Sequence, residues 1–317
     1  MQILVTGGAG FIGSHLCEKL LEDHHQVYCV DNFCDFYAPS VKEQNIQKAL
    51  LYPNFTLIKA DITEYKELEN VFLKRKIDLV IHLAAMAGVR PSITNPQLYF
   101  HVNIMGTANL LELCQIYGVK KFIFASSSSV YGNNEKIPFS EDDNVDFPIS
   151  PYAASKKACE LICHSYHKIH AMSIICLRLF TVYGPRQRPD LAIHDFTEKI
   201  LQDKEITLFG NGGSQRDYTF IDDILGGFLQ SIDYIFLGKK FQIFNLGEAQ
   251  TISLLQMVET IEKVLQKKAK KKFAPMQLGD VERTYADISK SKKILNYNPK
   301  IDFETGIKKF IDWKKNS

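Results

Sequence analysis

Short apolar segments alternate with longer segments of helical periodicity through about the first 180 residues of the chain. Apolar runs of strand length predict buried strands at residues 1–6, 26–30, 55–60, 79–83 and 121–125. Apolar residues at helical spacing predict helices at residues 11–21, 97–117 and 151–170. Strands that alternate with helices in this way indicate an α/β fold with a right-handed, doubly wound parallel sheet.

The alternation loosens in the second half of the chain. Pro185, Pro189 and a turn at residues 210–213 interrupt it, and a strand at 241–246 precedes a helix at 253–266. No repeat, low-complexity segment or linker marks a boundary, and 317 residues allow one large or two modest domains.

Three glycines, Gly7, Gly10 and Gly13, separate the first predicted strand from the first predicted helix. In a Rossmann-type dinucleotide site, the first glycine permits a tight turn and the second lets the backbone approach a pyrophosphate. The third lets the helix pack closely against its strand. The same spacing also occurs in plain turns, so the flanking strand and helix carry the interpretation.

Asp31 ends the second predicted strand, where an acidic residue binds the ribose hydroxyls of a dinucleotide. A carboxylate there favours NAD over NADP, because it repels a 2′-phosphate. The alternative role for Asp31 is that of a turn residue at a strand end.

Small and polar residues follow the other predicted strands, at the edge where open parallel sheets bind ligands. Asp61 and Ile62 are placed to meet an adenine, and the small residues of 84–88 let a backbone lie against the cofactor. The residues predicted to bind the cofactor are Gly7, Gly10, Phe11, Ile12, Gly13, Asp31, Asn32, Asp61, Ile62, Leu83, Ala84, Ala85, Tyr152 and Lys156.

Tyr152 and Lys156 stand four residues apart in the helix predicted at 151–170, so their side chains lie on one face. A lysine ammonium beside a phenol favours the phenolate, which makes Tyr152 a candidate proton acceptor for hydride transfer at a hydroxyl. Alone, such a pair is an ordinary feature of amphipathic helices. Because the pair follows a predicted dinucleotide-binding motif near the N-terminus, we interpret it as catalytic.

Motifs along nearly the whole chain resemble those of the extended short-chain dehydrogenases/reductases, and within that group the UDP-glucuronate 4-epimerases. The superfamily motifs are TGGAGFIGSH at 6–15, DNF at 31–33, HLAAMAGVR at 82–90 and YAASK at 152–156. More specific are FASSSSVYG at 124–132, LRLFTVYGPRQRPD at 177–190, RDYTFIDD at 216–223 and PMQLGDVERTYADISK at 275–290.

The resemblance also implies a division of the chain. An NAD-binding Rossmann domain is expected at residues 1–180, with a later segment, roughly 217–246, returning to it. Residues 181–317 are expected to form mainly a smaller α/β domain that binds the UDP-sugar substrate.

Ser127 occupies the position of the family's catalytic serine or threonine, which shortens the proton path to Tyr152; the alternative is a polar turn at a strand end. Similar dehydratases carry an Asp-Glu pair at the positions of Ser128 and Ser129, and related decarboxylases carry Glu at the second. This chain therefore lacks the acid and base for elimination, and oxidation followed by re-reduction at one carbon remains.

A glucuronate substrate brings a chemical hazard, because oxidation of its 4-hydroxyl gives a β-keto acid that loses carbon dioxide easily. Ser128, Ser129, Thr181 and Arg188 are candidates to hold its carboxylate, although Arg186 and Arg188 are alternatively solvated loop arginines. The residues expected to bind substrate are Gly88, Arg90, Ser127, Ser128, Ser129, Thr181, Arg188, Leu208 and Phe209 (uracil), Arg216 (diphosphate), Gln277 and Asp280.

The resemblance thus implies an NAD-dependent isomerase of nucleotide-sugar metabolism, a UDP-glucuronate 4-epimerase that forms UDP-galacturonate. It would act by oxidation at sugar carbon 4, rotation of the 4-keto intermediate and re-reduction. Alternatives are a UDP-glucose or UDP-N-acetylglucosamine 4-epimerase, a UDP-glucuronate decarboxylase, or a non-catalytic NAD-binding protein.

Composition bears on partners and location. The net charge of +2 gives no reason to expect nucleic acid, and no apolar run reaches the ~18 residues of a membrane span. Seven cysteines without a CxxC pair suit reduced thiols in the cytoplasm, and no metal site is predicted. The lysines within 267–272 are expected in a solvated loop between a helix and a strand, or else on a surface for anions.

A homodimer is expected through a four-helix contact, the arrangement familiar in the resembled family. The helices predicted at 97–117 and 151–170 carry apolar residues on more than one face, which such a contact would cover. The alternative is that one subunit buries both faces by itself. The apolar residues concerned are Leu110, Leu111, Leu113, Ile116, Leu161, Ile162, Tyr166 and Ile169.

Overall fold

The computed structural model describes residues 1–276, 279 and 281–316. The chain forms two compact units. The first comprises Met1–Gly132, Asn144–Arg178 and Phe228–Phe244, and the second comprises Asn133–Asp143, Leu179–Gly227 and Asn245–Ser317. The assignment of one part to the cofactor and another to the substrate stays a prediction.

A seven-stranded sheet with the order β11-β6-β5-β4-β1-β2-β3 is the core of the first unit. Its strands are β1 (Gln2–Thr6), β2 (Gln26–Asp31), β3 (Phe55–Lys59), β4 (Leu79–His82), β5 (Lys121–Ser127), β6 (Ser173–Leu179) and β11 (Phe241–Leu246). β1 pairs in parallel with β2 on one side and β4 on the other, and the strand order reverses there. The predicted doubly wound parallel sheet is confirmed.

The strands form where the sequence is continuously apolar, because a parallel strand is buried on both faces. In β1, for example, Ile3, Leu4 and Val5 are fully buried. Right-handed crossovers place α1 (Phe11–Glu22) and α2 (Pro39–Asn45) on one face of the sheet.

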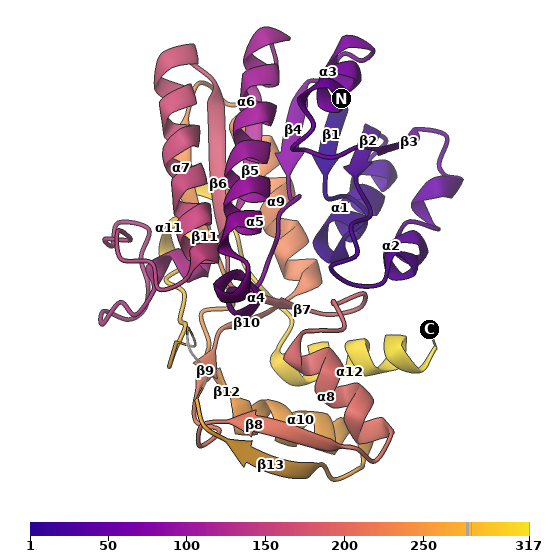
Figure 1. Ribbon diagram of the computed structural model, residues 1–317, viewed down its shortest axis with the longest axis vertical. Helices are drawn as coiled ribbons and strands as arrows, with labels where there is room; N and C mark the ends of the chain where they lie inside the picture. The colour runs from indigo at the N-terminus through magenta and orange to yellow at the C-terminus, as the bar shows by residue number, and fades with distance from the viewer. Residues whose placement is uncertain (277–278, 280, 317) are drawn as a thin grey trace. The chain divides into compact units, whose positions relative to one another are not determined.

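The same rule places α3 (Tyr65–Leu73), α6 (Gly106–Ile116) and α7 (Pro151–His170) on the other face. Helices α6 and α7 lie side by side along the sheet (Figure 1). The other helical segments of the first unit are η1 (Ala49–Leu51), α4 (Val89–Thr94), α5 (Pro96–Tyr99), η2 (Phe100–Met105) and η3 (Ser128–Tyr131). Helix α9 (Ile221–Ile235) begins in the second unit and continues in the first from Phe228.

The segment 97–117 is helical throughout but is not one α-helix. Between α5 and α6 the chain widens into η2, a π-helical segment. Gly106 begins α6, and a Cβ atom there would meet the side chain of Ile62, which would have to shift. The widened turn carries Asn103 into the interior of the unit.

The second unit is built from two-stranded sheets and four helices. β7 (Thr181–Tyr183) pairs in parallel with β10 (Tyr218–Phe220), β8 (Glu205–Phe209) pairs in parallel with β13 (Lys270–Ala274), and β9 (Gln215–Arg216) pairs antiparallel with β12 (Ile252–Ser253). The helices are α8 (Ala192–Leu201), α10 (Leu254–Leu265), α11 (Ser289–Leu295) and α12 (Phe303–Lys315).

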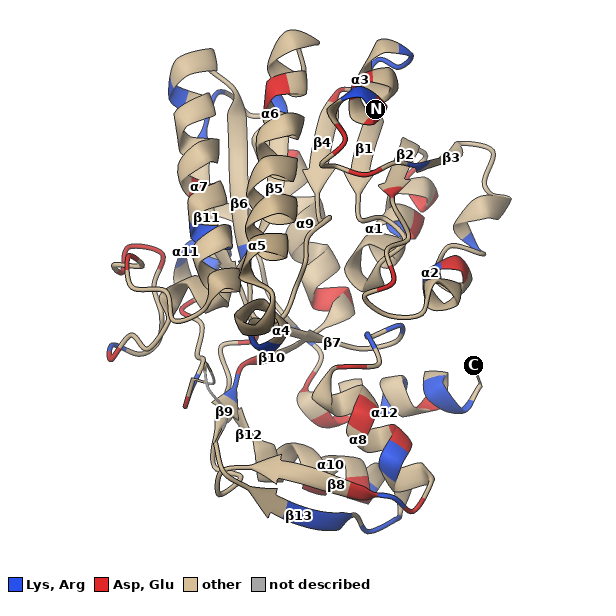
Figure 2. Ribbon diagram, in the orientation of Figure 1, with Lys and Arg blue, Asp and Glu red and all other residues tan. Residues whose placement is uncertain are grey.

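The prediction of a loop for the lysine cluster was wrong for Lys270, Lys271 and Lys272, which belong to β13. Figure 2 shows their stripe of positive charge along that strand. Lys268 and Lys271 form ion pairs with Glu262, whose side chain is buried. These contacts fix part of the cluster against α10 within the second unit.

His82 closes β4 and is 1 % exposed. The hydroxyl of Thr107 donates to the carbonyl of Asn103, so it accepts a hydrogen bond from Nε2 of His82 at 3.0 Å. Nδ1 of His82 then accepts from the hydroxyl of Thr6 at 2.7 Å, and Thr6 Oγ1 accepts from the amide of Ala84. Burial, reinforced by the charge of Lys156, lowers the pKa of His82 to about 3.

We expect this buried neutral histidine to make the protein less stable as pH falls. Its folded pKa lies below the unfolded value of about 6.5, so the stabilisation is complete above that pH and is lost on acidification. Between pH 7 and pH 5 the free energy of unfolding should fall by about 2 kcal/mol from this residue. Urea unfolding at both pH values measures the loss, which should shrink in His82→Gln and persist in the exposed His101→Gln. An undiminished loss in His82→Gln would contradict this origin.

Candidate functional site

The loop between β1 and α1 has the geometry of a phosphate cradle. Gly7 has a φ of +68°, and a Cβ atom there would lie 2.7 Å from the amide nitrogen of Ala84. At Gly13 a Cβ atom would clash with the carbonyl oxygen of Gly7, so only a glycine at this position lets α1 lie this close to the loop. Gly10 caps α1, and no acidic residue stands in the first turn, so the positive end of the helix dipole is available to an anion.

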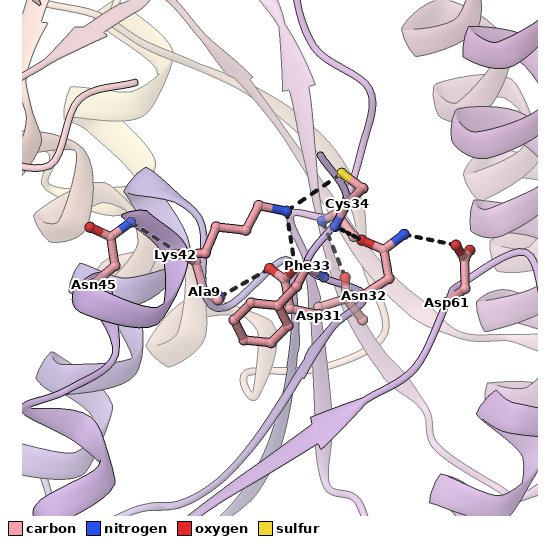
Figure 3. Close-up of polar contacts among 10 residues, drawn as sticks. Ala9, Asp31, Asn32, Phe33, Cys34, Lys42, Asn45 and Asp61 are labelled. Atoms are coloured by element: carbon pink, nitrogen blue, oxygen red, sulfur yellow. Dashed lines mark hydrogen bonds and ion pairs between the residues drawn. The ribbon is translucent and has the colours of Figure 1, made fainter. Parts of the chain in front are cut away.

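Asp31 lies at the carboxyl end of β2 and is 5 % exposed (Figure 3). Its carboxylate accepts hydrogen bonds from the amides of Ala9 and Phe33 at 3.1 and 2.9 Å. Nζ of Lys42, on α2, lies 3.2 Å from Oδ1 of Asp31 and 3.5 Å from Sγ of Cys34. The predicted ribose ligand is thus tied to the glycine loop and compensated by a buried cation.

Lys42 is a residue of this site that sequence reasoning missed. It stands eleven positions after Asp31 on another element, and no motif marks it. Asn45, one turn further along α2, donates to the carbonyl of Ala9 at 3.1 Å and also joins α2 to the glycine loop. Figure 3 shows Lys42 directed at Asp31 and Asn45 directed at Ala9.

Asn32 and Asp61 are brought together as the sequence predicted for strand ends of one sheet. The amide of Asn32 donates to Oδ2 of Asp61 at 2.7 Å, and Thr63 donates to Oδ1 through its amide and its hydroxyl. Partial burial raises the pKa of Asp61, but these hydrogen bonds outweigh it and the net pKa is lowered. Ile62 is buried against α6.

The segment after β4, which contains Leu83, Ala84 and Ala85, is held by Asn103. The side chain of Asn103 accepts from the amide of Met86 at 2.8 Å, and it donates to the carbonyl of Met86 and to Oγ of Ser155. Sequence reasoning did not single out Asn103, because its partners lie far away along the chain. It links the candidate cofactor loop to helix α7.

Helix α7 carries the candidate catalytic pair. Ser150 caps it by accepting from the amide of Ala153 at 3.1 Å, and Pro151 occupies its first turn. Lys156 is buried, and its ammonium donates to the carbonyl of Ala125 on β5 at 2.8 Å. Tyr152 is half-buried, with its ring edge-on to Tyr99 at a centroid distance of 6.2 Å.

The serine run begins at the carboxyl end of β5, directly after Ala125, whose carbonyl Lys156 binds. Oγ of Ser127 lies 3.2 Å from Oγ of Ser129 and accepts from the amide of Ser129 at 3.1 Å. Ser127 and Ser128 are buried, and Ser129 is half-buried. The first unit therefore places Ser127 on the strand against which α7 is fastened.

Gly88 and Arg90 stand at the start of α4. Gly88 has a φ of +111°, which favours glycine, and it precedes the helix as its cap. The side chain of Arg90 is exposed.

In the second unit, Thr181 lies on β7, and Arg216 lies on β9 directly before Asp217. The amide of Thr181 donates to the carbonyl of Asp217 at 3.0 Å. Nη1 of Arg216 donates to the carbonyl of Gln215 at 2.9 Å. Arg188 donates to both oxygens of Asp190, at 2.9 and 2.8 Å.

Leu208 is fully buried in β8, so its side chain supports the unit's interior, whereas Phe209 is half-buried. Arg186 adopts a φ of +64°, an unusual conformation for a residue with a Cβ atom. Gln277 and Asp280, which were expected to bind substrate, lie outside the described residues.

Residues 4–310 match the family model described as GDP-mannose 4,6 dehydratase. The chain belongs to the NAD-dependent epimerase/dehydratase family.

Members of this family with sugar-nucleotide substrates resemble the chain along its whole length. A UDP-glucuronate 4-epimerase of Thermodesulfobacterium geofontis is 44 % identical over 98 % of this chain and 95 % of its own. The UDP-glucuronic acid 4-epimerase of Bacillus cereus, solved with UDP-glucuronic acid and NAD, is 40 % identical, with a TM-score of 0.93 over 100 % of this chain and 99 % of its own.

A UDP-glucose 4-epimerase of Thermotoga maritima, solved with UDP-glucose, also shares the fold. It is 32 % identical, with a TM-score of 0.91 over 100 % of this chain and 99 % of its own. This family member differs from the preceding two in the sugar that its name specifies.

Asp217 holds three segments of the second unit together and is fully buried. Its two oxygens accept hydrogen bonds from the amides of Glu248, Ala249 and Ala286 and from the hydroxyl of Thr219. Burial raises the pKa of Asp217 to about 6, although these donors favour the ionised form.

We expect Asp217→Asn to lower the free energy of unfolding by about 2–4 kcal/mol, because the new NH₂ group would face amide donors. The matched control is Asp222→Asn, which removes an exposed carboxylate paired with Lys309 and should change stability by less than ~0.5 kcal/mol. Urea denaturation at pH 7.5 measures both. Equal losses in the two variants would contradict the proposed role of Asp217.

Proposed function

We propose that this protein is an NAD-dependent UDP-glucuronate 4-epimerase, which interconverts UDP-glucuronate and UDP-galacturonate. The observation that carries the proposal is the placement of Tyr152 and Lys156 on α7, fastened to the strand that ends in Ser127. Similarity over nearly the full chain to proteins named as UDP-glucuronate 4-epimerases supports the choice of sugar.

The residues at the end of β1 and β2 fit a dinucleotide. The glycine cradle leaves no room for side chains between loop and helix, as a closely bound pyrophosphate requires. Asp31 and Lys42 would hold the ribose of the adenosine half, and the small residues after β4 would border the cofactor. Bound NAD supplies a hydride acceptor for sugar carbon 4 and a donor for its return.

The protein's own residues handle the proton. Tyr152 takes the proton of the sugar 4-hydroxyl and later returns it, while Ser127 donates a hydrogen bond to the same oxygen. Lys156 is one turn from Tyr152, and its charge stabilises the phenolate. Because Lys156 is held by the carbonyl of Ala125, its ammonium is oriented before substrate arrives.

Elimination and decarboxylation are disfavoured by Ser128 and Ser129. A serine hydroxyl cannot serve as the acid and base that loss of water needs, so the proposed activity is epimerisation. Retention of carbon dioxide requires the substrate carboxylate to be held away from alignment with the 4-keto group. We assign that task to Ser128, Ser129 and Thr181. Arg188 takes part only if it shares its guanidinium with Asp190.

We retain the proposed division of labour in the chain. Residues 1–180, with a segment of 217–246, would bind NAD, and residues 181–317 would bind most of the UDP-sugar. Phe209 and Arg216 are the proposed contacts to uracil and diphosphate. We also propose a cytoplasmic location, because all seven cysteines are free thiols. Among the described helices, none combines the length and apolarity needed to cross a membrane.

Incubation with UDP-glucuronate, followed by NMR, tests the proposed function. We expect UDP-galacturonate to accumulate to an equilibrium mixture, without stoichiometric release of NADH at 340 nm. The control substrate is UDP-glucose, which lacks the carboxylate and should be converted at least tenfold more slowly. Conversion of UDP-glucose alone would identify a hexose 4-epimerase, and a pentose product would identify a decarboxylase.

Tyr152→Phe should reduce turnover by at least about 10²-fold and leave NAD binding intact, because it removes the proposed base and keeps the ring. Lys156→Met should reduce turnover comparably and also weaken retention of NAD. The control is Tyr166→Phe on the same helix, which removes a hydroxyl bound to Glu112 and should keep wild-type turnover. More than a tenth of wild-type turnover in Tyr152→Phe would show that Tyr152 is not the base.

The proposed homodimer rests on a narrower surface than the sequence suggested. Leu110, Leu111 and Leu113 are buried within the chain itself. The large apolar side chains left exposed on α6 and α7 are those of Ile116 (51 %), Leu161 (58 %) and Ile169 (70 %). A two-fold contact between these helices would cover them.

We expect light scattering at micromolar concentration to give the mass of a dimer for the wild type. Leu161→Glu should shift the mass toward a monomer, because it places a charge in the contact. Leu51→Glu, at a position 83 % exposed on η1, is the matched control and should leave the dimer intact. A monomeric wild type would refute this assembly.

A further inference from the structure

Glu160 and Arg178 form an ion pair that is almost completely shielded from solvent. Their side chains are 2 % and 1 % exposed. Nε of Arg178 donates to Oε1 of Glu160 at 2.9 Å, and Nη2 donates to Oε2 at 2.8 Å, so the contact is bidentate. Burial acts to lower the pKa of Arg178, but the contact with Glu160 raises it overall, so the guanidinium stays charged.

The pair joins the elements that carry the candidate catalytic residues. Glu160 lies on α7, one turn past Lys156 and two turns past Tyr152. Oε1 of Glu160 also accepts a hydrogen bond of 2.6 Å from the hydroxyl of Ser126, the residue directly before Ser127.

Arg178 extends the same network to two further elements. It belongs to β6, and its guanidinium carbon lies 4.8 Å from the centre of the Tyr131 ring. Tyr131 ends η3, the short helix that contains Ser128 and Ser129. Four elements of the first unit, β5, η3, α7 and β6, therefore meet at one buried ion pair.

Two consecutive residues of β5 contact α7, directly before Ser127. The carbonyl of Ala125 binds Lys156, the hydroxyl of Ser126 binds Glu160, and Ser127 comes next. These two contacts restrain both the sliding of α7 along β5 and the rotation of the helix about its axis. Either movement of the helix would displace Tyr152 relative to Ser127.

Stability alone does not account for this pair. Removing two charges from water costs several kcal/mol, and replacing a buried ion pair by apolar residues of similar volume is often neutral or stabilising. Each oxygen of Glu160 is hydrogen-bonded, so the pair is built with directional contacts that an apolar core would not supply. A proton-transfer site needs such directional contacts, because its reacting groups must be held in a fixed orientation.

We propose that Glu160 and Arg178 are positioning residues, which hold Ser127 and Tyr152 in register for proton transfer. The proposal rests on the proposed function for its effect on turnover. Neither residue is assigned a contact with the substrate or the cofactor. Their effect passes through Ser126, Tyr131 and helix α7.

The first test is the double variant Glu160→Leu/Arg178→Met, which removes both charges and keeps similar volume. We expect its unfolding midpoint to stay close to that of the wild type, with NAD still bound. Turnover should fall between about 10-fold and 100-fold, while KM changes less than threefold. A large fall in turnover with little change in KM, in a protein that is still folded, indicates that the reacting groups are misplaced and that the loss is not one of folded protein.

A second variant isolates the contact with Ser126. In Glu160→Gln/Arg178→Met the amide oxygen can still accept from the Ser126 hydroxyl, and neither charge of the ion pair remains. We expect this variant to regain part of the turnover lost by the leucine-containing one. Tyr166→Phe is the control on the same helix, because it removes only a hydrogen bond to Glu112 on α6. It should retain wild-type turnover.

A measurement without substrate separates this proposal from the proposed function. In protein labelled with ¹³C on the tyrosine rings, the Tyr152 signal is assigned by its disappearance in Tyr152→Phe. We expect that signal to move in Glu160→Leu/Arg178→Met and to stay in place in Tyr166→Phe.

The outcomes are distinct. An unmoved Tyr152 signal, or wild-type turnover in the double variant, overturns the positioning role even if the wild type is an epimerase. A moved signal in a protein that fails to convert UDP-glucuronate upholds the positioning role and rejects the proposed function. Should the double variant not fold, Arg178→Lys replaces it, because it keeps the charge and loses the bidentate contact. An unmoved Tyr152 signal in that variant overturns the role equally.

Discussion

The hydrogen bond from Lys156 to the carbonyl of Ala125 determines where the chemistry of this protein can occur. It fastens α7 to β5 at the place where the strand ends, so that the residues following Ala125 and those preceding Lys156 share one edge of the sheet. The parallel topology makes that edge the same one at which β1 and β2 end. The residues proposed for cofactor binding and for proton transfer are therefore placed at the same edge of the sheet, although they are far apart in the sequence.

A second constraint is the treatment of buried charge. Asp31 is compensated by Lys42 and by two backbone amides, so it can remain at the end of β2 with little exposure. Because Lys42 and the two amides compensate the charge of Asp31, repulsion of a 2′-phosphate by this carboxylate is not the sole reason for selecting NAD over NADP. Geometry contributes as well, because Asp31 is bound to Ala9 within the glycine loop.

Much of this organisation could be predicted from the sequence, because local patterns specify it. Apolar runs located six strands of the seven-stranded sheet, but β6 (Ser173–Leu179) was not among the predicted strands. Helix α7 begins and ends at the residues expected. The glycine spacing predicted a loop whose close contacts require glycine. Other features depend on tertiary contacts that leave no local signal. β13 consists largely of lysines and becomes a strand only by pairing with β8.

The same limit applies to the site. Lys42 and Asn103 act on residues far from them along the chain, so neither stands in a recognisable motif with its partner. Leu110, Leu111 and Leu113 looked available to a dimer because periodicity does not distinguish a face buried by the sheet from one covered by a second subunit.

The central claim is that hydride leaves sugar carbon 4 and returns to the same carbon within one catalytic cycle. Incubation with UDP-glucuronate deuterated at carbon 4, in ordinary water, tests it most directly. The account predicts UDP-galacturonate that retains deuterium at carbon 4, with no deuterium lost to solvent. Product that has exchanged this label for solvent hydrogen would contradict the account, because it would require a proton abstraction at carbon 4 instead of a hydride transfer.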